Sequence, residues 1–274
     1  RYAAIADTLL QAPLEVTDPE TGQVEPFTYQ DFIGLSLGSL YSPFRFAQLA
    51  ELLTDIETAL AQPVPAPAQM GEAIEEMEEE ISPARNRGPR EKYVNAVEGF
   101  VGVACTDTNN PSDYDVWFDQ GVAADANGYF GRIWTWASSP CARWPFNDRD
   151  RYVGPFDAET ANPVLVVSPL YDPATRYEGA QALRSLLPNS SLLSADVPGH
   201  TTLGISGCAG FVVGQYFLDP AVADAVDGLT CPAEFNPFDA VAPAAATSET
   251  PDPALRKAAM VETNVLPLVN VFEE

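Results

Sequence analysis

Two β-branched runs and two amphipathic segments alternate between residues 163 and 218, and this order limits the possible folds most strongly. Residues 163–168 (Pro-Val-Leu-Val-Val-Ser) form an apolar run bounded by proline and turn residues, which is typical of a strand covered on both faces. Residues 177–187 have helical spacing, residues 191–197 are strand-like, and residues 206–218 indicate another helix. Strand, helix, strand and helix in this order predict an α/β fold with a parallel sheet and right-handed crossovers.

A carboxylate and an imidazole follow the two predicted strands. Asp172 comes four residues after the first strand, and His200, the one histidine of the chain, comes just after the second. Catalytic groups of open parallel sheets gather at the carboxyl ends of the strands, so we expect both side chains at the same edge. An acid that orients a histidine, which then takes a proton from a nucleophile, is the relay of a hydrolase triad. The order acid before histidine suits the α/β-hydrolase arrangement. Each residue alone also fits a bland role, as a turn aspartate before Pro173 or a surface-loop imidazole.

Charge and composition exclude several classes of partner. The 274 residues contain 39 Asp and Glu against 14 Lys and Arg, which gives a formal net charge of −25. Such a chain repels phosphate backbones and anionic lipids, so we expect neither nucleic-acid nor membrane binding. No apolar run approaches the roughly 18 residues of a spanning helix. Because the chain has one histidine, no C-x-x-C pair and no calcium-loop pattern, we expect no metal and no cofactor.

The cysteines bear on the compartment. The chain has Cys105, Cys141, Cys208 and Cys231, which permit three disulfide pairings, and four buried free thiols in a cytosolic protein remain an alternative. The even count, the acidic balance and a sequon that makes Asn189 a glycosylation candidate favour an oxidising compartment. We therefore expect a secreted protein.

The N-terminal third is predicted to be helical. Apolar residues recur at helical spacing over residues 28–61, where Pro43 separates two segments. An extended Pro-Val-Pro-Ala-Pro linker over residues 63–67 follows. Residues 72–80 hold six glutamates around a thin apolar stripe, which indicates a solvated helix or a mobile insertion.

The rest of the chain suggests where the domains divide. Residues 97–105 read as a β-like run, and an apolar stretch over residues 265–272 could dock as an edge strand. We predict a helical lid over residues 1–92 with a Glu-rich insertion over about 63–92, an α/β core over 93–239, and a loose Ala/Pro-rich tail over 240–274.

Seven short segments carry a resemblance to a known family. In order they are Tyr41-Ser42-Pro43, Ala104-Cys105-Thr106-Asp107, Cys141-Ala142-Arg143-Trp144-Pro145, Asn162-Pro163-Val164-Leu165, Asp172-Pro173-Ala174-Thr175, Gly199-His200-Thr201 and Thr230-Cys231-Pro232. Together they resemble the C-terminal portion of secreted tripeptidyl-aminopeptidase-like α/β-hydrolases, serine peptidases of actinomycetes and filamentous fungi. The resemblance covers about residues 27–239.

This resemblance implies roles for particular residues. It makes Asp172 the triad acid, His200 the triad base and residues 28 to about 92 a lid, and it implies the pairings Cys105–Cys141 and Cys208–Cys231. The chain departs from the family at Thr175-Arg176, where a threonine-proline is common, and in its insertion over residues 70–90.

The nucleophile is the part that the resemblance does not supply. Gly34-Leu35-Ser36-Leu37-Gly38 spells G-x-S-x-G, but residues 28–33 read as the start of a helix rather than as the buried strand that an elbow needs. We therefore expect Ser36 to pack in a helix. We expect the serine and the oxyanion hole to lie on an N-terminal fragment of the same precursor, covering the sheet edge that would otherwise be exposed.

The expected function is that of the acid/base half of a secreted serine hydrolase, an aminopeptidase that takes short peptides from the free N-termini of peptide substrates. The alternatives are a non-catalytic binding or structural subunit, an esterase or lactonase on the same scaffold, and a complete small hydrolase that uses Ser36.

Overall fold

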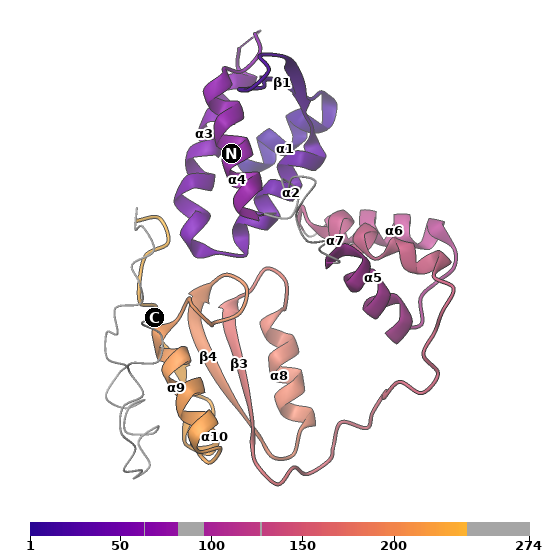
Figure 1. Cartoon of the computed structure of the whole chain (residues 1–274), viewed down its shortest axis with the longest axis vertical. Coiled ribbons are helices and arrows are strands. Elements are labelled where there is room, and N and C mark those ends of the chain that lie inside the picture. The colour runs from indigo at the N-terminus through magenta and orange to yellow at the C-terminus, as the bar shows by residue number, and fades with distance from the viewer. Residues whose placement is uncertain (63, 82–95, 127, 240–274) are drawn as a thin grey trace, which may run out of the picture. The chain divides into compact units, whose positions relative to one another are not determined.

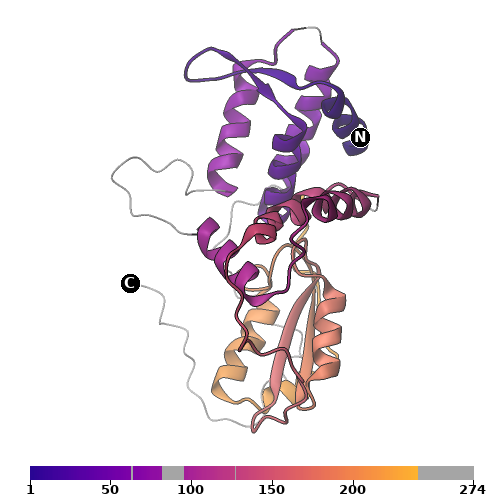
Figure 2. The ribbon, with the colours of Figure 1, turned by 90° about the vertical axis from the view of Figure 1, so that its right-hand side faces the viewer.

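The computed structural model describes residues 1–62, 64–81, 96–126 and 128–239. Figure 1 and the turned view in Figure 2 show two compact units, and each is described by itself. The helical unit contains residues 1–39 and 45–153, and the sheet unit contains residues 40–44 and the chain from Gly154 onward.

Some predicted boundaries cannot be compared with these units. The boundary between residues 92 and 93, the tail over residues 240–274 and its edge strand over 265–272 lie outside the described residues. The division into a lid, a core and a tail therefore stays a prediction.

The helical unit consists mainly of helices around one apolar core. Along α3, Leu49, Leu52 and Ile56 recur every three or four residues and are buried. The Glu-rich segment is helical, as predicted, and its apolar stripe is buried at Ile74 and Met77 in the same core. Its elements are α1 (Tyr2–Gln11), β1 (Leu14–Thr17), β2 (Val24–Phe27), α2 (Tyr29–Leu40), α3 (Phe46–Leu60), α4 (Ala68–Ile81), α5 (Ala96–Asp107), α6 (Tyr114–Asp125), α7 (Gly131–Ala137) and the 3₁₀ helix η2 (Ser139–Arg143). The 3₁₀ helix η1 (Pro43–Arg45), between α2 and α3, lies mostly in residues 40–44 of the sheet unit.

The predicted β-like run over residues 97–105 is wrong, because this segment is the helix α5. Cys105 on α5 is joined to Cys141 in η2, and the indole Nε1 of Trp144 donates to the Thr106 hydroxyl over 2.9 Å. Cys105 and Thr106 are thus both tied to η2 and the residues after it. These tertiary contacts override the strand preference of the valines and phenylalanine in the run.

The sheet unit confirms the predicted α/β class with a parallel sheet. Its strands are β3 (Val164–Tyr171), β4 (Ser190–Pro198) and the short β5 (Thr230–Cys231), in the order β3-β4-β5 and parallel throughout. The helices α8 (Tyr177–Leu186), α9 (Gly207–Leu218) and α10 (Val222–Val226) follow the strands along the chain. The register pairs Val164 with Ser190 and Tyr171 with Pro198, so β3 and β4 end together.

Helices cover both faces of this sheet. Leu193, Ala195 and Val197 on β4 are buried against α9 and α10. The residue between them, Ser194, faces the other way and shares a 2.7 Å hydrogen bond with the hydroxyl of Tyr177 on α8. Since side chains alternate along a strand, α8 lies on one face and α9 with α10 on the other, as both views of the ribbon show.

Both predicted disulfides are present. Cys105–Cys141 joins α5 to η2 in the helical unit, and Cys208–Cys231 joins α9 to β5 in the sheet unit. All four cysteines are buried, and the alternative of free thiols is excluded for this structure.

The outer edge of β3 has no strand beside it among the described residues. A groove of about 480 Å³ runs between β3 and α8, lined by Val166, Ser168, Ala180 and Leu183 among others. Leu183 is 42% exposed and α8 has no buried residue. An uncovered edge of a parallel sheet beside a half-covered helix is unusual for a finished core.

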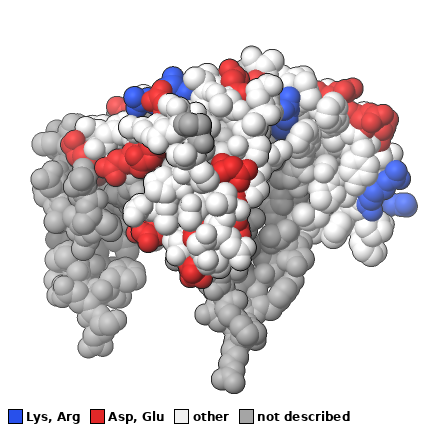
Figure 3. Space-filling view, turned by 90° about the horizontal axis from the view of Figure 1, so that it is seen from above, with Lys and Arg blue, Asp and Glu red and all other residues white. Residues whose placement is uncertain are grey.

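The charge is distributed over the surface. Figure 3 shows Asp and Glu side chains spread among uncharged ones, with Lys and Arg at separate points. None of the helices in the described part of the chain is long and apolar enough to cross a membrane.

Candidate catalytic site

Asp172 and His200 meet at the carboxyl edge of the sheet, as the order of the predicted strands indicated. Asp172 directly follows β3, and His200 comes two residues after the end of β4. The imidazole Nδ1 lies 3.0 Å and 3.1 Å from the two carboxylate oxygens of Asp172. The Asp172 side chain is 1% exposed, whereas the His200 side chain is 33% exposed. The pair therefore has a buried acid and a partly solvent-accessible base.

The local sequence after β3 explains how Asp172 is held. Its Oδ1 accepts the backbone N–H groups of Ala174 and Thr175, both over 2.8 Å. Its Oδ2 accepts the Thr175 hydroxyl over 2.8 Å and the Thr201 backbone N–H over 3.1 Å. An aspartate that bonds backbone groups two and three residues later is a usual way to close a turn, and it fixes the carboxylate plane.

These bonds decide the ionisation of Asp172. Burial alone would raise the pKa of the carboxyl group, but the N–H donors of Thr175, Thr201 and Ala174, with the Thr175 hydroxyl, outweigh it and lower the pKa to about 2. The group is thus ionised at neutral pH. A carboxylate can only accept, so the neutral imidazole keeps its proton on Nδ1 and leaves Nε2 as a proton acceptor.

We expect the low pKa of Asp172 to appear in the acid stability of the sheet unit. A folded-state pKa of about 2, below an unfolded value near 3.9, makes ionised Asp172 stabilising above pH 4 by about 2 kcal/mol. This contribution is lost as the pH falls through about 2. The difference in unfolding free energy between the wild type and Asp172→Asn, measured in urea, should therefore shrink by about 2 kcal/mol between pH 6 and pH 2. A difference that does not change with pH would contradict this expectation.

The backbone around His200 is fixed as well. The His200 N–H donates to the Tyr41 carbonyl over 2.8 Å, and the Gly199 N–H donates to the Tyr171 carbonyl over 3.2 Å. Thr201 has a positive φ of 68°, which turns its N–H back toward Asp172. Among the described residues no group hydrogen-bonds the imidazole Nε2. This is the geometry that a general base needs before its substrate is present.

Ser36 is not placed as a nucleophile, in agreement with the expected packing role. It lies in the middle of α2, is 1% exposed and is surrounded by the helical core. β2 ends at Phe27 and α2 begins at Tyr29, so Ser36 lies seven residues inside the helix and not at the strand-to-helix turn that an elbow serine occupies. The hypothesis of a complete small hydrolase that uses Ser36 is therefore rejected.

Two other features lie away from the Asp172–His200 pair in the sequence. The Asn189 side-chain amide donates to the Thr160 carbonyl over 2.8 Å. The glycosylation of Asn189 stays a prediction.

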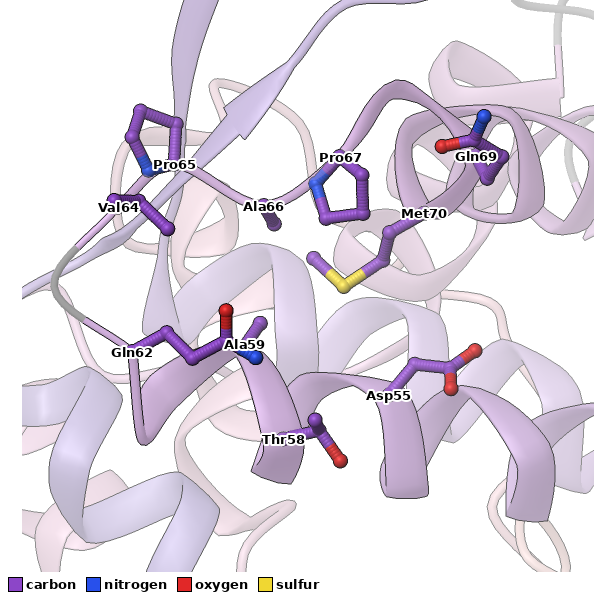
Figure 4. Close-up of a pocket in the computed structure, with 10 residues that line it drawn as sticks. All are labelled: Asp55, Thr58, Ala59, Gln62, Val64, Pro65, Ala66, Pro67, Gln69 and Met70. Carbon is purple, nitrogen blue, oxygen red and sulfur yellow. The ribbon is translucent and has the colours of Figure 1, made fainter.

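The helical unit has a pocket of about 310 Å³ between α3 and the start of α4, shown in Figure 4. Among the described residues that line it, Asp55 is the one ionisable side chain, so the pocket contains no acid/base pair. No group of three His, Cys, Asp or Glu side chains in the described ranges could hold a metal ion.

Residues 127–231 match the model of the TAP-like protein family of α/β-hydrolases. This part of the chain is therefore similar to the TAP-like hydrolases. This match covers the disulfide partners Cys141, Cys208 and Cys231 as well as Asp172 and His200. It extends from the last helices of the helical unit to β5.

Three curated relatives that the chain matches are named a carboxylesterase or a tripeptidyl aminopeptidase. A carboxylesterase B of Mycobacterium tuberculosis strain H37Rv is 28% identical over 225 residues, which is 80% of this chain and 39% of the relative. A tripeptidyl aminopeptidase of Streptomyces coelicolor is 31% identical over 145 residues, which is 50% of this chain and 26% of the relative. Another, of Streptomyces lividans, is 31% identical over 126 residues, or 43% and 22%. The chain thus spans well under half the length of the relatives it matches.

The residues that support the Asp172–His200 pair were not predicted. Thr175 was quoted in a segment of the family resemblance and beside the departure at Arg176, but it was given no role, although an Asp followed three residues later by a threonine is a recognisable turn pattern. Thr201 and Tyr41 gave no comparable signal, since their contacts with Asp172 and His200 are made across long stretches of the chain.

Proposed function

We propose that Asp172 and His200 are the acid and base of a serine-hydrolase triad, and that the nucleophilic serine lies on a segment outside the 274 residues. The observation that carries this proposal is the buried, ionised Asp172 on Nδ1 of an imidazole whose Nε2 has no partner among the described residues. The TAP-like match and the names of the relatives support a hydrolase.

In this proposal each group has one step. His200 Nε2 takes the proton of the serine hydroxyl as the oxygen attacks the scissile carbonyl carbon. The imidazolium, stabilised by Asp172, then gives that proton to the leaving amine while the carbon–nitrogen bond breaks. Water then takes the place of the amine: His200 removes its proton as the water oxygen attacks the carbonyl carbon of the acyl-enzyme. The serine oxygen leaves and takes the proton from the imidazolium, which restores the serine and the neutral imidazole.

The missing serine implies a partner for the sheet. We propose that a parallel strand from the N-terminal part of the same precursor lies along the free edge of β3. The bare edge and the groove between β3 and α8 support this, because such a strand would satisfy the outer backbone groups of β3 and cover Val166 and Leu183. Arg176, which belongs to the departure from the family pattern at Thr175-Arg176, also lines this groove.

Two substrate classes are candidates for this triad. We propose a secreted aminopeptidase that releases short peptides from free N-termini, supported by two aminopeptidase relatives, two disulfides and the acidic surface. An esterase is the second candidate, because the relative matched over most of this chain is named a carboxylesterase. Acyl transfer to an ester or an amide uses the same triad.

The experiment is labelling of the full-length natural protein with a fluorophosphonate serine probe, followed by intact-mass analysis under reducing and non-reducing conditions. We expect the label on a serine outside these 274 residues, within the same chain or a co-purifying fragment. Peptidyl amides and short-chain esters then separate the two substrate classes by their kcat/KM values. Absence of label on any chain would overturn the proposal and favour a non-catalytic binding subunit.

A further inference from the structure

We propose that residues Leu40–Phe44, which we call the strap, position the His200 imidazole, and that Tyr41 is the positioning residue within it. This inference rests on the proposed function, in which His200 is the triad base. The strap connects α2 to α3 along the chain, yet by its contacts it belongs to the sheet unit that contains His200.

Tyr41 contacts His200 with both its backbone and its side chain. Its carbonyl accepts the His200 N–H over 2.8 Å, which fixes the backbone from which the imidazole projects. Its ring meets the imidazole edge-on, with the centroids 5.1 Å apart and the planes at 65°. Burial and the nearby charge of Asp172 raise the pKa of the Tyr41 phenol, which places this ring in the field of the same carboxylate.

Asp172 alone does not fix the imidazole plane. Nδ1 is nearly equidistant from the two carboxylate oxygens, at 3.0 Å and 3.1 Å, so small ring rotations exchange one hydrogen bond for the other at little cost. The edge-on ring of Tyr41 restricts that rotation from the side. The aim of Nε2 therefore depends on the strap as well as on the acid.

The approach of the strap to the His200 loop is close and leaves little space. Pro43 is fully buried, and a Cβ atom at Gly199 would lie 2.8 Å from its Cδ and 3.1 Å from the Tyr41 carbonyl oxygen. Gly199 also has a φ of +111°, in the region that favours glycine. The glycine before His200 is thus required by the contact with the strap.

The strap is anchored at its other end. Phe44 stacks on Phe235, with ring centroids 5.4 Å apart and planes at 14°. The neighbouring Glu234 accepts the N–H groups of Gly207 and Cys208, where α9 begins, over 2.8 Å and 2.7 Å. The loop that starts at Gly199 is therefore fixed by contacts near both of its ends. The strap makes the contact next to the imidazole, and Glu234 makes the contacts at the start of α9.

The first test observes the imidazole directly in the full-length protein labelled with ¹⁵N-histidine, where the signals of His200 are those lost in His200→Gln. Their nitrogen shifts report the tautomer, and relaxation reports the order of the ring. We expect one tautomer, protonated on Nδ1, in the wild type and in Tyr41→Phe, which keeps the ring. Tyr41→Ala should keep this tautomer, because Asp172 still accepts from Nδ1, but should give a mobile ring. Phe217→Ala, an exposed aromatic at the far end of α9, is the matched control and should match the wild type.

The second test is kinetic, on the full-length protein. Tyr41→Ala should lower kcat up to about 100-fold with KM nearly unchanged, as expected for a misaimed base, while Tyr41→Phe stays within about threefold of the wild type. Should Tyr41→Ala fail to fold, Tyr41→Leu keeps the bulk without the aromatic edge and carries the same expectations.

The two proposals fail in different ways. Unchanged ring order in folded Tyr41→Ala or Tyr41→Leu would overturn the positioning role of Tyr41, since this measurement needs no nucleophile. A wild-type full-length protein that takes no serine probe would overturn the proposed function instead.

Discussion

Replacing Asp172 by asparagine in the full-length protein is expected to lower kcat about 10⁴-fold and to slow fluorophosphonate labelling in parallel. Asparagine has the same shape, so the turn bonds from Ala174 and Thr175 to Oδ1 can persist. The new amide group, however, takes the place of Oδ2, where its hydrogens face the Thr201 N–H and Nδ1, and the negative charge that stabilises the imidazolium is lost. The tautomer protonated on Nε2, whose Nδ1 accepts from the amide, then competes with the productive one, and in it Nε2 cannot take the serine proton.

The matched control for this variant is Asp227→Asn in the same unit. Asp227 forms an ion pair with Arg184 on α8 and accepts the N–H of Leu192 on β4, and both interactions lower its pKa. Its partly exposed side chain therefore links α8 to β4. It has no hydrogen bond to His200, so Asp227→Asn should cost some stability and leave kcat within about twofold. If Asp172→Asn kept more than about a tenth of the activity, or if Asp227→Asn lost as much, Asp172 would not be the triad acid.

The elements that could be predicted are those with a signal in their own residues. The continuous β-branched run indicates the strand β3, and apolar residues at helical spacing indicate the helix α8. The meeting of Asp172 and His200 followed from topology, since parallel neighbours deliver their carboxyl ends to one edge.

Other elements depend on contacts that a local pattern does not contain. Residues 97–105 have strand-like composition, and α5 forms there because Cys105 and Thr106 are tied to η2 and Trp144. The hairpin of β1 and β2 was not predicted, and β1 is completed by a bridge from Val16 to Ala66, about fifty residues later. Pairings at such separations leave no signal in a short window of sequence.

The same holds for the candidate site. Asp172 and His200 could be predicted by residue type and position, but the residues that orient their side chains could not. Tyr41 lies in a segment quoted for the family resemblance, and nothing in its sequence said that it reaches His200, 159 positions along the chain. Disulfide pairing was likewise open among three possibilities on spacing alone, and the resemblance decided it correctly.

The second large effect is expected from removal of the disulfide Cys208–Cys231. It closes a loop over a sequence separation of 23 residues, so Cys208→Ala/Cys231→Ala should lower the unfolding free energy of the sheet unit by about 3 kcal/mol. This disulfide joins α9 to β5. Helix α9 begins just after the His200 loop, and β5 pairs with β4 over only two residues. Besides the disulfide, the hydrogen bonds from the Gly207 and Cys208 N–H groups to Glu234 tie the segment after β5 to the start of α9.

The other disulfide provides a matched control. Cys105→Ala/Cys141→Ala opens a loop with a separation of 36 residues in the helical unit and should cost that unit a similar free energy. The four tryptophans, Trp117, Trp134, Trp136 and Trp144, all belong to the helical unit, and the one histidine belongs to the sheet unit. Tryptophan fluorescence and the His200 NMR signal therefore follow the two units separately during urea unfolding.

We expect each variant to move one transition. The Cys208–Cys231 variant should shift the His200 transition to lower urea and leave the tryptophan transition in place, and the Cys105–Cys141 variant should do the reverse. If both probes moved together for either variant, the two units would unfold as one, and the stability of the site would depend on the helices as much as on its own disulfide. Separate shifts would mean that the Asp172–His200 geometry is maintained by the sheet unit, the strap and one disulfide.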